Sequence, residues 1–206
     1  MMSDDRIYTD INCFVHKTSE VGKRVHIGES TKIWQNCTIL DDVTIGYQCN
    51  IGQNVYIESG VTIGNRVKIK NNIAIYQGVV CEDDVFIGPN CVFTNVINPR
   101  SFINRKEEIK KTIIKKGATL GANSTIVCGN TVGKFAMVGA GSVVTRNVKP
   151  FELVYGNPAK VKGYVCICGS KLEESAQIGW MCKICKRAYV MENDELVYKG
   201  DNDGVY

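Results

Sequence analysis

Four cysteines near the end of the chain have the spacing of a metal site: Cys166, Cys168, Cys182 and Cys185. They form a C-x-C pair and a C-x2-C pair, a combination that suits tetrahedral Zn²⁺. The stretch KRAYVMENDELVYK after them alternates like a hairpin with Asn193-Asp194 at its turn. We therefore expect a zinc-ribbon-like module over residues 164–206, in which Zn²⁺ is structural because so small a segment lacks a sufficient core. Free structural thiols are the alternative.

A second set of chemistry-bearing residues lies in a basic stretch, INPRSFINRKEEIKK, at residues 97–111. Its charges sum to +3: Arg100, Arg105, Lys106, Lys110 and Lys111 against Glu107 and Glu108. One interpretation is a solvated surface loop. The other is a lid that offers cations to an anionic ligand. The position of the stretch, directly after FTNV (93–96), favours the lid.

The element that carries these residues is a six-residue repeat, visible in VHIGES TKIWQN CTILDD VTIGYQ from Val25 onward. The first position holds small or β-branched residues, and positions four to six are rich in Gly, Asn, Asp and Gln. The third position holds Val15, Val21, Ile27, Ile33, Ile39, Ile45, Ile51, Ile57, Ile63, Ile69, Ile75, Cys81, Ile87 and Phe93, then Ile114, Leu120, Ile126, Val132, Val138 and Val144. Short alternating strands joined by turn residues predict a coiled, all-β solenoid.

The basic stretch interrupts this repeat by a length that matters. After Phe93 the next third position falls at 99, but the pattern resumes at Ile114, and 114 − 99 = 15. Fifteen is not a multiple of six, so residues 97–111 cannot add complete strands. We expect them to leave the solenoid as an extruded loop between stacked coils, of which about six to seven are expected at three repeats per coil.

The remaining cysteines fit the solenoid core. Cys13, Cys37, Cys49 and Cys91 occupy the first position of their repeats and Cys81 the third. Because both positions face inward, these thiols are expected to pack as small apolar groups rather than to act in catalysis.

Composition sets the outer limits on function. The chain has 206 residues, 44% apolar and 22% charged, with a net charge of +4, which is too weak to argue for nucleic acid. It has neither a basic, apolar signal segment at its start nor a run of eighteen apolar residues. We expect a cytoplasmic protein that does not bind membranes.

Residues 13–163 resemble the hexapeptide-repeat acyltransferases, which are left-handed parallel β-helices. IGQN (51–54), KIKNN (68–72) and FTNVINPR (93–100) are similar to the nucleotide-sugar N-acetyltransferases acting on UDP-2-acetamido-3-amino-2,3-dideoxy-D-glucuronate. GNPAK (156–160) is shared by many hexapeptide acetyltransferases. One departure is Trp34-Gln35, where members have a histidine. A sister branch, which acetylates dTDP-3-amino-3,6-dideoxyhexoses, suits that IWQN segment as well.

The resemblance implies an acetyl-CoA donor, a homotrimer with sites between neighbouring prisms, and a set of site residues. Asn95 is the expected catalytic residue, because an amide can accept from an amine and donate to a carbonyl. Asn72, Tyr76 and Arg100 are expected to contact the sugar. Gly121, Gly139, Ala140 and Lys160 are expected to bind CoA. The expected domains are an acyltransferase β-helix over residues 1–163 and the cysteine module over residues 164–206.

The histidine content bears on mechanism. The chain has only His16 and His26, in the fourth and second positions of early repeats, so neither is expected to be catalytic. A γ-type carbonic anhydrase needs three histidines per site and is excluded. A direct attack by the sugar amine on the thioester is expected instead, with the departing thiolate taking the proton. A non-catalytic scaffold and a protein that binds partners through its ribbon are the rival classes.

Overall fold

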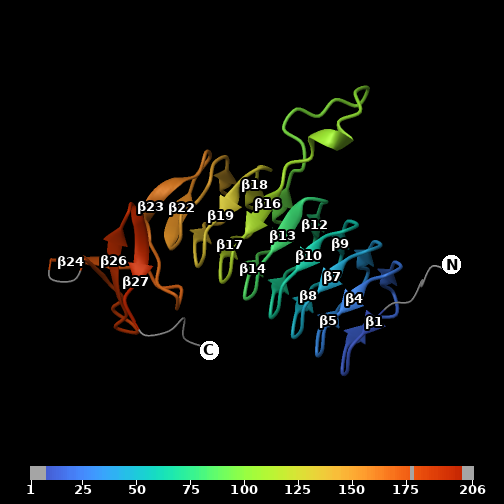
Figure 1. The fold of residues 1–206 in the computed structure, drawn as a ribbon, viewed down its shortest axis with the longest axis horizontal. Coiled ribbons are helices and arrows are strands. Elements are labelled where there is room, and N and C mark those ends of the chain that lie inside the picture. The colour runs from blue at the N-terminus through green and yellow to red at the C-terminus, as the bar shows by residue number, and fades with distance from the viewer. Residues whose placement is uncertain (1–7, 177–178, 201–206) are drawn as a thin grey trace.

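The computed structural model describes residues 8–176 and 179–200, and the chain forms a stack of seven coils with a small module at one end (Figure 1). Strands of mostly two to three residues line three sheets, which follow one another in each coil and are parallel except for the last strand of the second sheet. The first sheet contains β1 (Tyr8–Thr9), β4 (His26–Ile27), β7 (Thr44–Ile45), β10 (Thr62–Ile63), β13 (Val79–Cys81), β16 (Thr112–Ile114) and β19 (Thr131–Val132).

The other two sheets repeat this arrangement. The second contains β2 (Phe14–Val15), β5 (Lys32–Ile33), β8 (Asn50–Ile51), β11 (Lys68–Ile69), β14 (Phe86–Ile87), β17 (Thr119–Leu120), β20 (Met137–Val138), β22 (Glu152–Tyr155) and β23 (Lys160–Tyr164). The third contains β3 (Glu20–Val21), β6 (Thr38–Ile39), β9 (Val55–Ile57), β12 (Ile73–Ile75), β15 (Val92–Phe93), β18 (Thr125–Ile126) and β21 (Val143–Val144).

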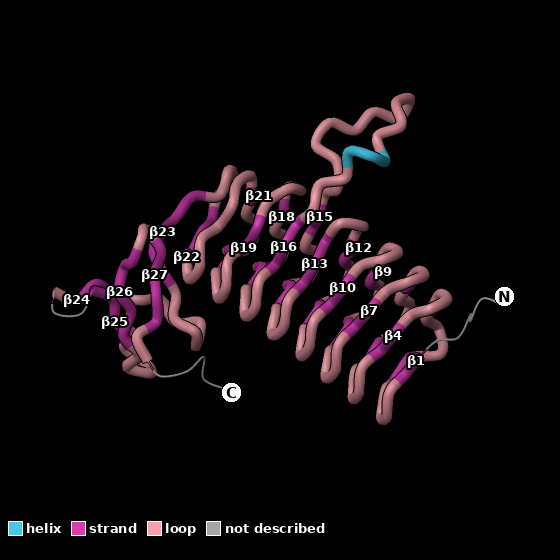
Figure 2. The backbone as a smooth tube through the Cα atoms, in the orientation of Figure 1, coloured by secondary structure: helices cyan, strands magenta, loops and turns pink. Residues whose placement is uncertain are grey.

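The register confirms the predicted repeat and its interruption. Thr62 pairs with Val80, eighteen residues on, as three repeats of six require. Across the interruption Val79 pairs with Thr112, thirty-three residues on, and 33 − 18 = 15. Residues 97–111 therefore leave the stack as one extruded loop, which carries the three-residue 3-10 helix η1 (Lys106–Glu108) (Figure 2). Strand β1, before the repeat becomes visible in the sequence, was not predicted.

Each coil turns at residues that tolerate a left-handed backbone. The sixth position of the repeat has positive φ again and again, as at Asn36, Asn54, Asn72 and Asn90. Asparagine, aspartate and glycine adopt this conformation at the least cost. The fourth position brings neighbouring coils close together, because a Cβ added to Gly46 would lie 2.6 Å from the carbonyl oxygen of Gly64.

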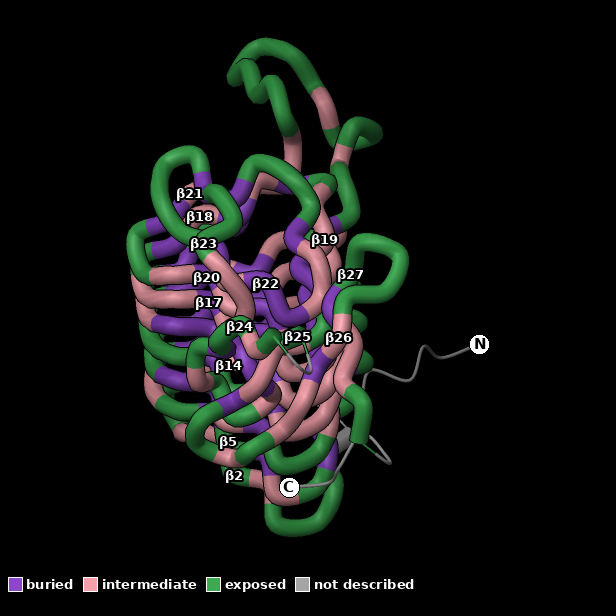
Figure 3. The backbone as a smooth tube through the Cα atoms, turned by 90° about the vertical axis from the view of Figure 1, so that its left-hand side faces the viewer, coloured by how far each residue is buried: buried purple, intermediate pink, exposed green. Residues whose placement is uncertain are grey.

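The third-position side chains fill the inside of the prism. Figure 3 marks the buried positions of the backbone in purple. The predicted packing of the scattered cysteines is confirmed for Cys37, Cys49, Cys81 and Cys91, which are at most 2% exposed. Burial raises the pKa of the Cys81 thiol to about 12 and that of Cys91 to about 11. These thiols therefore stay protonated and act as small core residues.

The C-terminal module is built on a second, antiparallel sheet of β24 (Glu173–Ser175), β25 (Gly179–Met181), β26 (Ala188–Glu192) and β27 (Glu195–Tyr198). The predicted hairpin is confirmed, with Asn193 and Asp194 both at positive φ in its turn. Strand β23 still pairs with β22 of the solenoid and leads directly into the module. The boundary between residues 163 and 164 stays a prediction. Within the described residues, no helix is long and apolar enough to cross a membrane.

Candidate active site and metal centre

The extruded loop folds back over earlier coils and encloses a cavity of ≈ 520 Å³. One wall comes from the edge of the prism where the third sheet turns into the first, and the other comes from the loop itself. The cavity is lined by Leu40, Glu58, Ser59, Gln77, Asn95, Val96, Pro99, Arg100, Ile103, Arg105, Lys106 and Ile109. Three cations of the loop therefore face a solenoid wall of mixed character, in which Leu40 is apolar, Ser59 and Gln77 are polar and Glu58 is acidic. The cations suit the anionic part of a ligand of moderate size.

Asn95 lies at the foot of the loop and is half-buried in the cavity wall. Its backbone oxygen accepts a hydrogen bond of 2.9 Å from the N–H of Lys110, which ties the start of the loop to its end. The backbone N–H of Gln77, one coil earlier on the same edge, is held by Glu58. Asn95 thus belongs to a regular coil and lines the cavity beside the loop cations, where its carboxamide can contact a bound ligand.

The loop cations differ in how they are held. Arg105 makes an ion pair of 2.7 Å with Glu108, three residues further along the loop. Its Nε is buried without a hydrogen-bond partner among the described residues. Arg100 is exposed and donates only to the carbonyl oxygen of Pro99 within the described chain. Arg100 thus lines the same cavity as Asn95, and its contact with a sugar stays a prediction.

The other two residues expected to contact the sugar lie apart from Asn95. Asn72 stands at the edge where the second sheet turns into the third, with φ of 60° and a 3.0 Å hydrogen bond from Asn54. Its neighbour Asn71 lines a separate hollow of ≈ 220 Å³. Tyr76 follows β12 on the same edge as Asn95, but its ring packs against the core and against Tyr56, with ring centroids 6.4 Å apart. Neither side chain lines the cavity beneath the loop.

The residues expected to bind CoA gather near the C-terminal end of the solenoid. A Cβ on Gly121 would lie 2.5 Å from the backbone nitrogen of Ala140, and one on Gly139 would lie 2.8 Å from the Cβ of Tyr155. The structure thus brings Gly121, Gly139 and Ala140 onto adjacent coils at one edge of the prism. Lys160 opens β23, is exposed, and pairs with Tyr155 across the hairpin.

The two histidines lie at the opposite end of the stack from the C-terminal module, as expected (Figure 1). His16 bonds to Thr18 through Nδ1 at 3.0 Å, and His26 is exposed with Asp10 3.7 Å from its Nε2. Neither lines the cavity beneath the loop.

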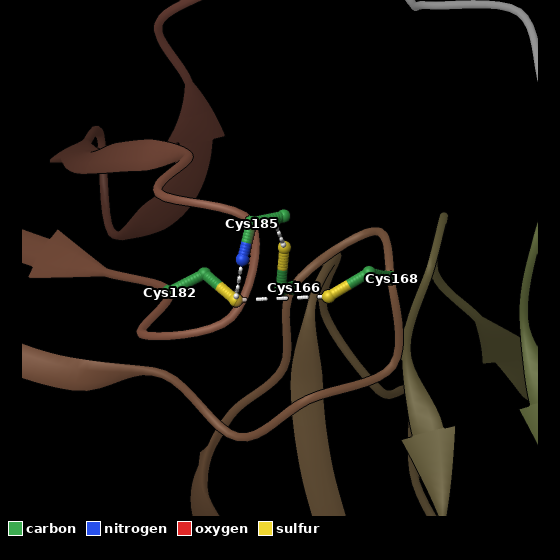
Figure 4. Close-up of side chains that lie close together, drawn as sticks. All are labelled: Cys166, Cys168, Cys182 and Cys185. Atoms are coloured by element: carbon green, nitrogen blue, oxygen red, sulfur yellow. Dashed lines mark hydrogen bonds between the residues drawn. The ribbon is translucent and has the colours of Figure 1, made fainter.

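The four predicted metal ligands converge at one point (Figure 4). Cys166 and Cys168 come from one turn and Cys182 and Cys185 from another, and all four sulfurs lie within 4.8 Å of one another. The Cys166–Cys185 and Cys168–Cys182 sulfur pairs are 3.3 and 3.6 Å apart. A tetrahedron of Zn–S bonds requires sulfur separations of about 3.8 Å, so the cluster fits Zn²⁺ after small adjustments.

The electrostatics of the cluster agree with a site that needs a cation. Burial raises the pKa of Cys166 to about 12. Although burial opposes ionisation of Cys185 too, hydrogen bonds led by the backbone N–H of Arg187 lower its pKa to about 6. Neighbouring sulfurs thus resist simultaneous ionisation by themselves, whereas a bound divalent cation favours four thiolates.

Tyr189 connects this cluster to the solenoid and was not expected from the sequence. Its hydroxyl donates to the sulfur of Cys166 at 3.0 Å and accepts from the N–H of Ile167 at 3.0 Å. Its ring, fully buried, packs edge-on against Phe151 at 5.2 Å, and Phe151 stacks on Phe135 of the last coils. Burial raises the pKa of the Tyr189 phenol further above its usual range, so the hydroxyl remains a donor.

Two family models match the coils. The hexapeptide repeat of succinyl-transferase matches residues 42–77 and 111–146, and the bacterial transferase hexapeptide (six repeats) matches residues 24–59. The two matched segments 42–77 and 111–146 stop on either side of the extruded loop. Together with the stacked parallel sheets, these matches confirm the predicted fold, which is that of the hexapeptide-repeat left-handed β-helix.

Curated relatives match only part of the chain. A dTDP-3-amino-3,6-dideoxy-alpha-D-galactopyranose 3-N-acetyltransferase of Aneurinibacillus thermoaerophilus is 63% identical over 67 residues, 32% of this chain and 35% of the relative. A 2,3,4,5-tetrahydropyridine-2,6-dicarboxylate N-acetyltransferase of Staphylococcus aureus is 38% identical over 78 residues, 38% of this chain and 30% of the relative. The chain thus spans about a third of the length of the curated relatives it matches.

Two solved structures share the fold at low identity. The N-acyltransferase AntD of Bacillus cereus, in complex with dTDP and coenzyme A, aligns with a TM-score of 0.52 at 20% identity, covering 77% of this chain and 83% of that one. The UDP-N-acetylglucosamine acyltransferase of Campylobacter jejuni aligns with a TM-score of 0.55 at 16% identity, covering 77% and 73%. At these identities the likeness concerns the fold alone.

Proposed function

We propose that this protein transfers the acetyl group of acetyl-CoA to the 3-amino group of a nucleotide-linked amino sugar. The observation that carries the proposal is the cavity beneath the extruded loop, where Asn95 meets three cations on an otherwise regular prism. A nucleotide sugar supplies the phosphates that such cations bind. The 63% identity to a 3-amino sugar N-acetyltransferase over 67 residues supports the same chemistry.

Two observations favour different nucleotide sugars as the substrate. The identity to the Aneurinibacillus enzyme favours a dTDP-linked 3-amino-3,6-dideoxyhexose. The motifs KIKNN and FTNVINPR favour UDP-2-acetamido-3-amino-2,3-dideoxy-D-glucuronate, whose carboxylate Arg100 could pair with in a bidentate manner. We place the dTDP-linked sugar first, because its support extends over a longer stretch of sequence.

The proposed chemistry relies on positioning. The neutral sugar amine attacks the thioester carbonyl carbon, the carbon–sulfur bond breaks, and the departing thiolate takes the proton that the nitrogen loses. Asn95 orients the amine or the carbonyl through its carboxamide. Holding the two reactants in contact can supply roughly 7–11 kcal/mol of the barrier, so a histidine base is not required.

We propose a homotrimer, which the resemblance to the hexapeptide-repeat acyltransferases implies, and the location of the proposed binding residues supports a site between neighbouring copies. Asn95 is on the edge between the third and first sheets, whereas Gly121 and Ala140 are on the edge between the second and third. A site that uses both edges is most simply formed by two neighbouring prisms. The third sheet, which lies between these edges, presents Glu20 in its first coil and uncharged side chains such as Thr38 and Tyr56 in later coils.

The cysteine cluster is proposed to hold structural Zn²⁺ through all four sulfurs, Cys166, Cys168, Cys182 and Cys185. The ion would supply the module with stability that its few apolar residues do not provide. Metal analysis of carefully prepared protein is expected to give one zinc per chain, and protein without zinc would contradict this part of the proposal.

The activity is tested by following CoA release from acetyl-CoA with dTDP-linked and UDP-linked 3-amino sugars in parallel. Turnover is expected with one of them, and the same sugars with a 3-hydroxyl serve as controls. The N-acetylated product identified by mass spectrometry would complete the assignment. Absence of release with both amino sugars would leave the scaffold or binding interpretation in its place.

A further inference from the structure

The cavity beneath the loop contains one carboxylate among its lining residues, that of Glu58. Glu58 follows β9 on the solenoid wall, two coils before Asn95 on the same edge. The cations Arg100, Arg105 and Lys106 belong to the loop. The cavity therefore has a negative charge on its solenoid side and positive charges on its loop side.

Among the described residues, Glu58 is held in place by a backbone hydrogen bond and not by an ion pair. Its Oε2 accepts a hydrogen bond of 2.7 Å from the backbone N–H of Gln77, one coil further along. No ion pair joins it to a loop cation in the part of the chain that the structure describes. The side chain is half-buried. One carboxylate oxygen is thus fixed by the backbone, and the other remains available to a ligand.

We infer that Glu58 binds the amino group of the sugar and so makes the site select amino sugars over hydroxyl sugars. The inference rests on the proposed function and extends it to specificity. A ligand with phosphates at one end and an amine at the other matches both signs of charge in the cavity. A sugar with a hydroxyl at the same carbon could offer the carboxylate only a neutral O–H donor in place of the N–H of a cationic ammonium, which makes the weaker contact.

Another glutamate, Glu82, makes the same structural contact as Glu58. Glu82 occupies the same position of its repeat, and its Oε2 accepts 2.9 Å from the backbone N–H of Lys116. Glu82 does not line the cavity. The two glutamates thus share the contact that stabilises a turn and differ in their access to the ligand, which makes Glu82→Gln a matched control for Glu58→Gln.

The test measures binding and turnover of the full-length wild type, E58Q and E82Q. The probes are a dTDP-linked 3-amino-3,6-dideoxyhexose, its UDP-linked uronate counterpart, and the corresponding 3-hydroxyl sugars. For E58Q we expect Kd and KM for the accepted amino sugar to rise roughly 10- to 100-fold, because a charge-assisted hydrogen bond is lost. Binding of the hydroxyl sugar should stay within about twofold, and E82Q should leave both ligands unchanged.

Three outcomes separate the two proposals. Turnover by the wild type with E58Q unchanged would overturn the inference alone. An equal loss for amino and hydroxyl sugars in E58Q, or the same loss in E82Q, would assign Glu58 a structural role and also overturn it. A wild type that acetylates no amino sugar would overturn the proposed function and this inference with it.

Discussion

Each coil of the β-helix is supported by the coils on both sides of it, whereas the module beyond Val165 depends on four sulfurs and a small apolar cluster. The core of the β-helix is one continuous cluster from Val25 to Ala159. Among its described residues, the module contributes only Leu172, Tyr189 and Leu196 as buried apolar residues, besides its cysteines. When one core contact of the β-helix is lost, many similar contacts remain in the neighbouring coils. When a cysteine or a buried apolar residue of the module is lost, no equivalent contact replaces it.

This comparison can be tested because each region contains one of the two tryptophans. Trp34 follows β5 in the second coil, and Trp180 lies in β25, with its ring 4.8 Å from that of Tyr164. Single-tryptophan variants, Trp34→Phe or Trp180→Phe, therefore report separately on the two regions by fluorescence.

The largest effect is expected from loss of the metal. Cys182→Ser, or a chelator such as EDTA, should unfold the module, because the metal supplies most of its folding free energy. Trp180 fluorescence should shift to that of exposed indole, while Trp34 and the far-ultraviolet signal of the β-helix stay unchanged. Cys128→Ser, a change at a buried thiol of the β-helix, is the control. Simultaneous loss of both tryptophan signals would contradict the independence of the two regions.

A smaller, local effect is expected from a cavity in the prism. Ile63 is 1% exposed and stacks between Ile45 and Cys81 of the adjacent coils. Ile63→Ala should lower the free energy of unfolding by about 2–5 kcal/mol, and Ile63→Val by about 0.5–1.5 kcal/mol. Chemical denaturation followed through Trp34 measures both. Equal losses in the two variants would indicate that the core collapses around the change.

The expected effect of Asn95→Ala falls on turnover rather than on the fold. Removal of the carboxamide should reduce kcat by roughly 10²-fold, since one oriented donor or acceptor is lost from the site. The Trp34 denaturation curve should be that of the wild type. Asn98→Ala, an exposed loop residue outside the cavity lining, serves as the control. Turnover of Asn95→Ala within threefold of the control would remove Asn95 from the mechanism.

The same comparison explains which features could be predicted from the sequence. Strand positions, the inward cysteines and the fifteen-residue insertion follow from a local period of six, so their register was available from counting. The same counting places Asn72 and Asn95 on different edges of the prism. They are twenty-three residues apart, and only residues separated by a multiple of eighteen, the length of one coil, lie above one another. The contributions of Glu58 and Gln77 to the cavity were missed, because they depend on how the loop folds back over earlier coils. No periodic signal encodes that path.

In the module, the spacing of the cysteines predicted the cluster but not its link to the β-helix. Tyr189 has the ordinary place of an inward residue in an alternating strand, and its type alone does not indicate a sulfur partner. The contact arises because the hairpin packs on Phe151 and so brings the phenol to Cys166. Such a contact between segments distant in sequence has no local signature.

The smallest of these effects is expected from Tyr189→Phe, which keeps the ring against Phe151 and removes only the hydroxyl. The N–H of Ile167 then loses its acceptor and the Cys166 sulfur its donor. We expect a loss of about 1–2 kcal/mol in the stability of the module, followed through Trp180, and about tenfold weaker zinc retention against a competing chelator. Tyr198→Phe is the control, because its hydroxyl makes no hydrogen bond to other described side chains. If both variants retain zinc equally, the metal site does not depend on the phenol, and the link between the regions lies in ring packing alone.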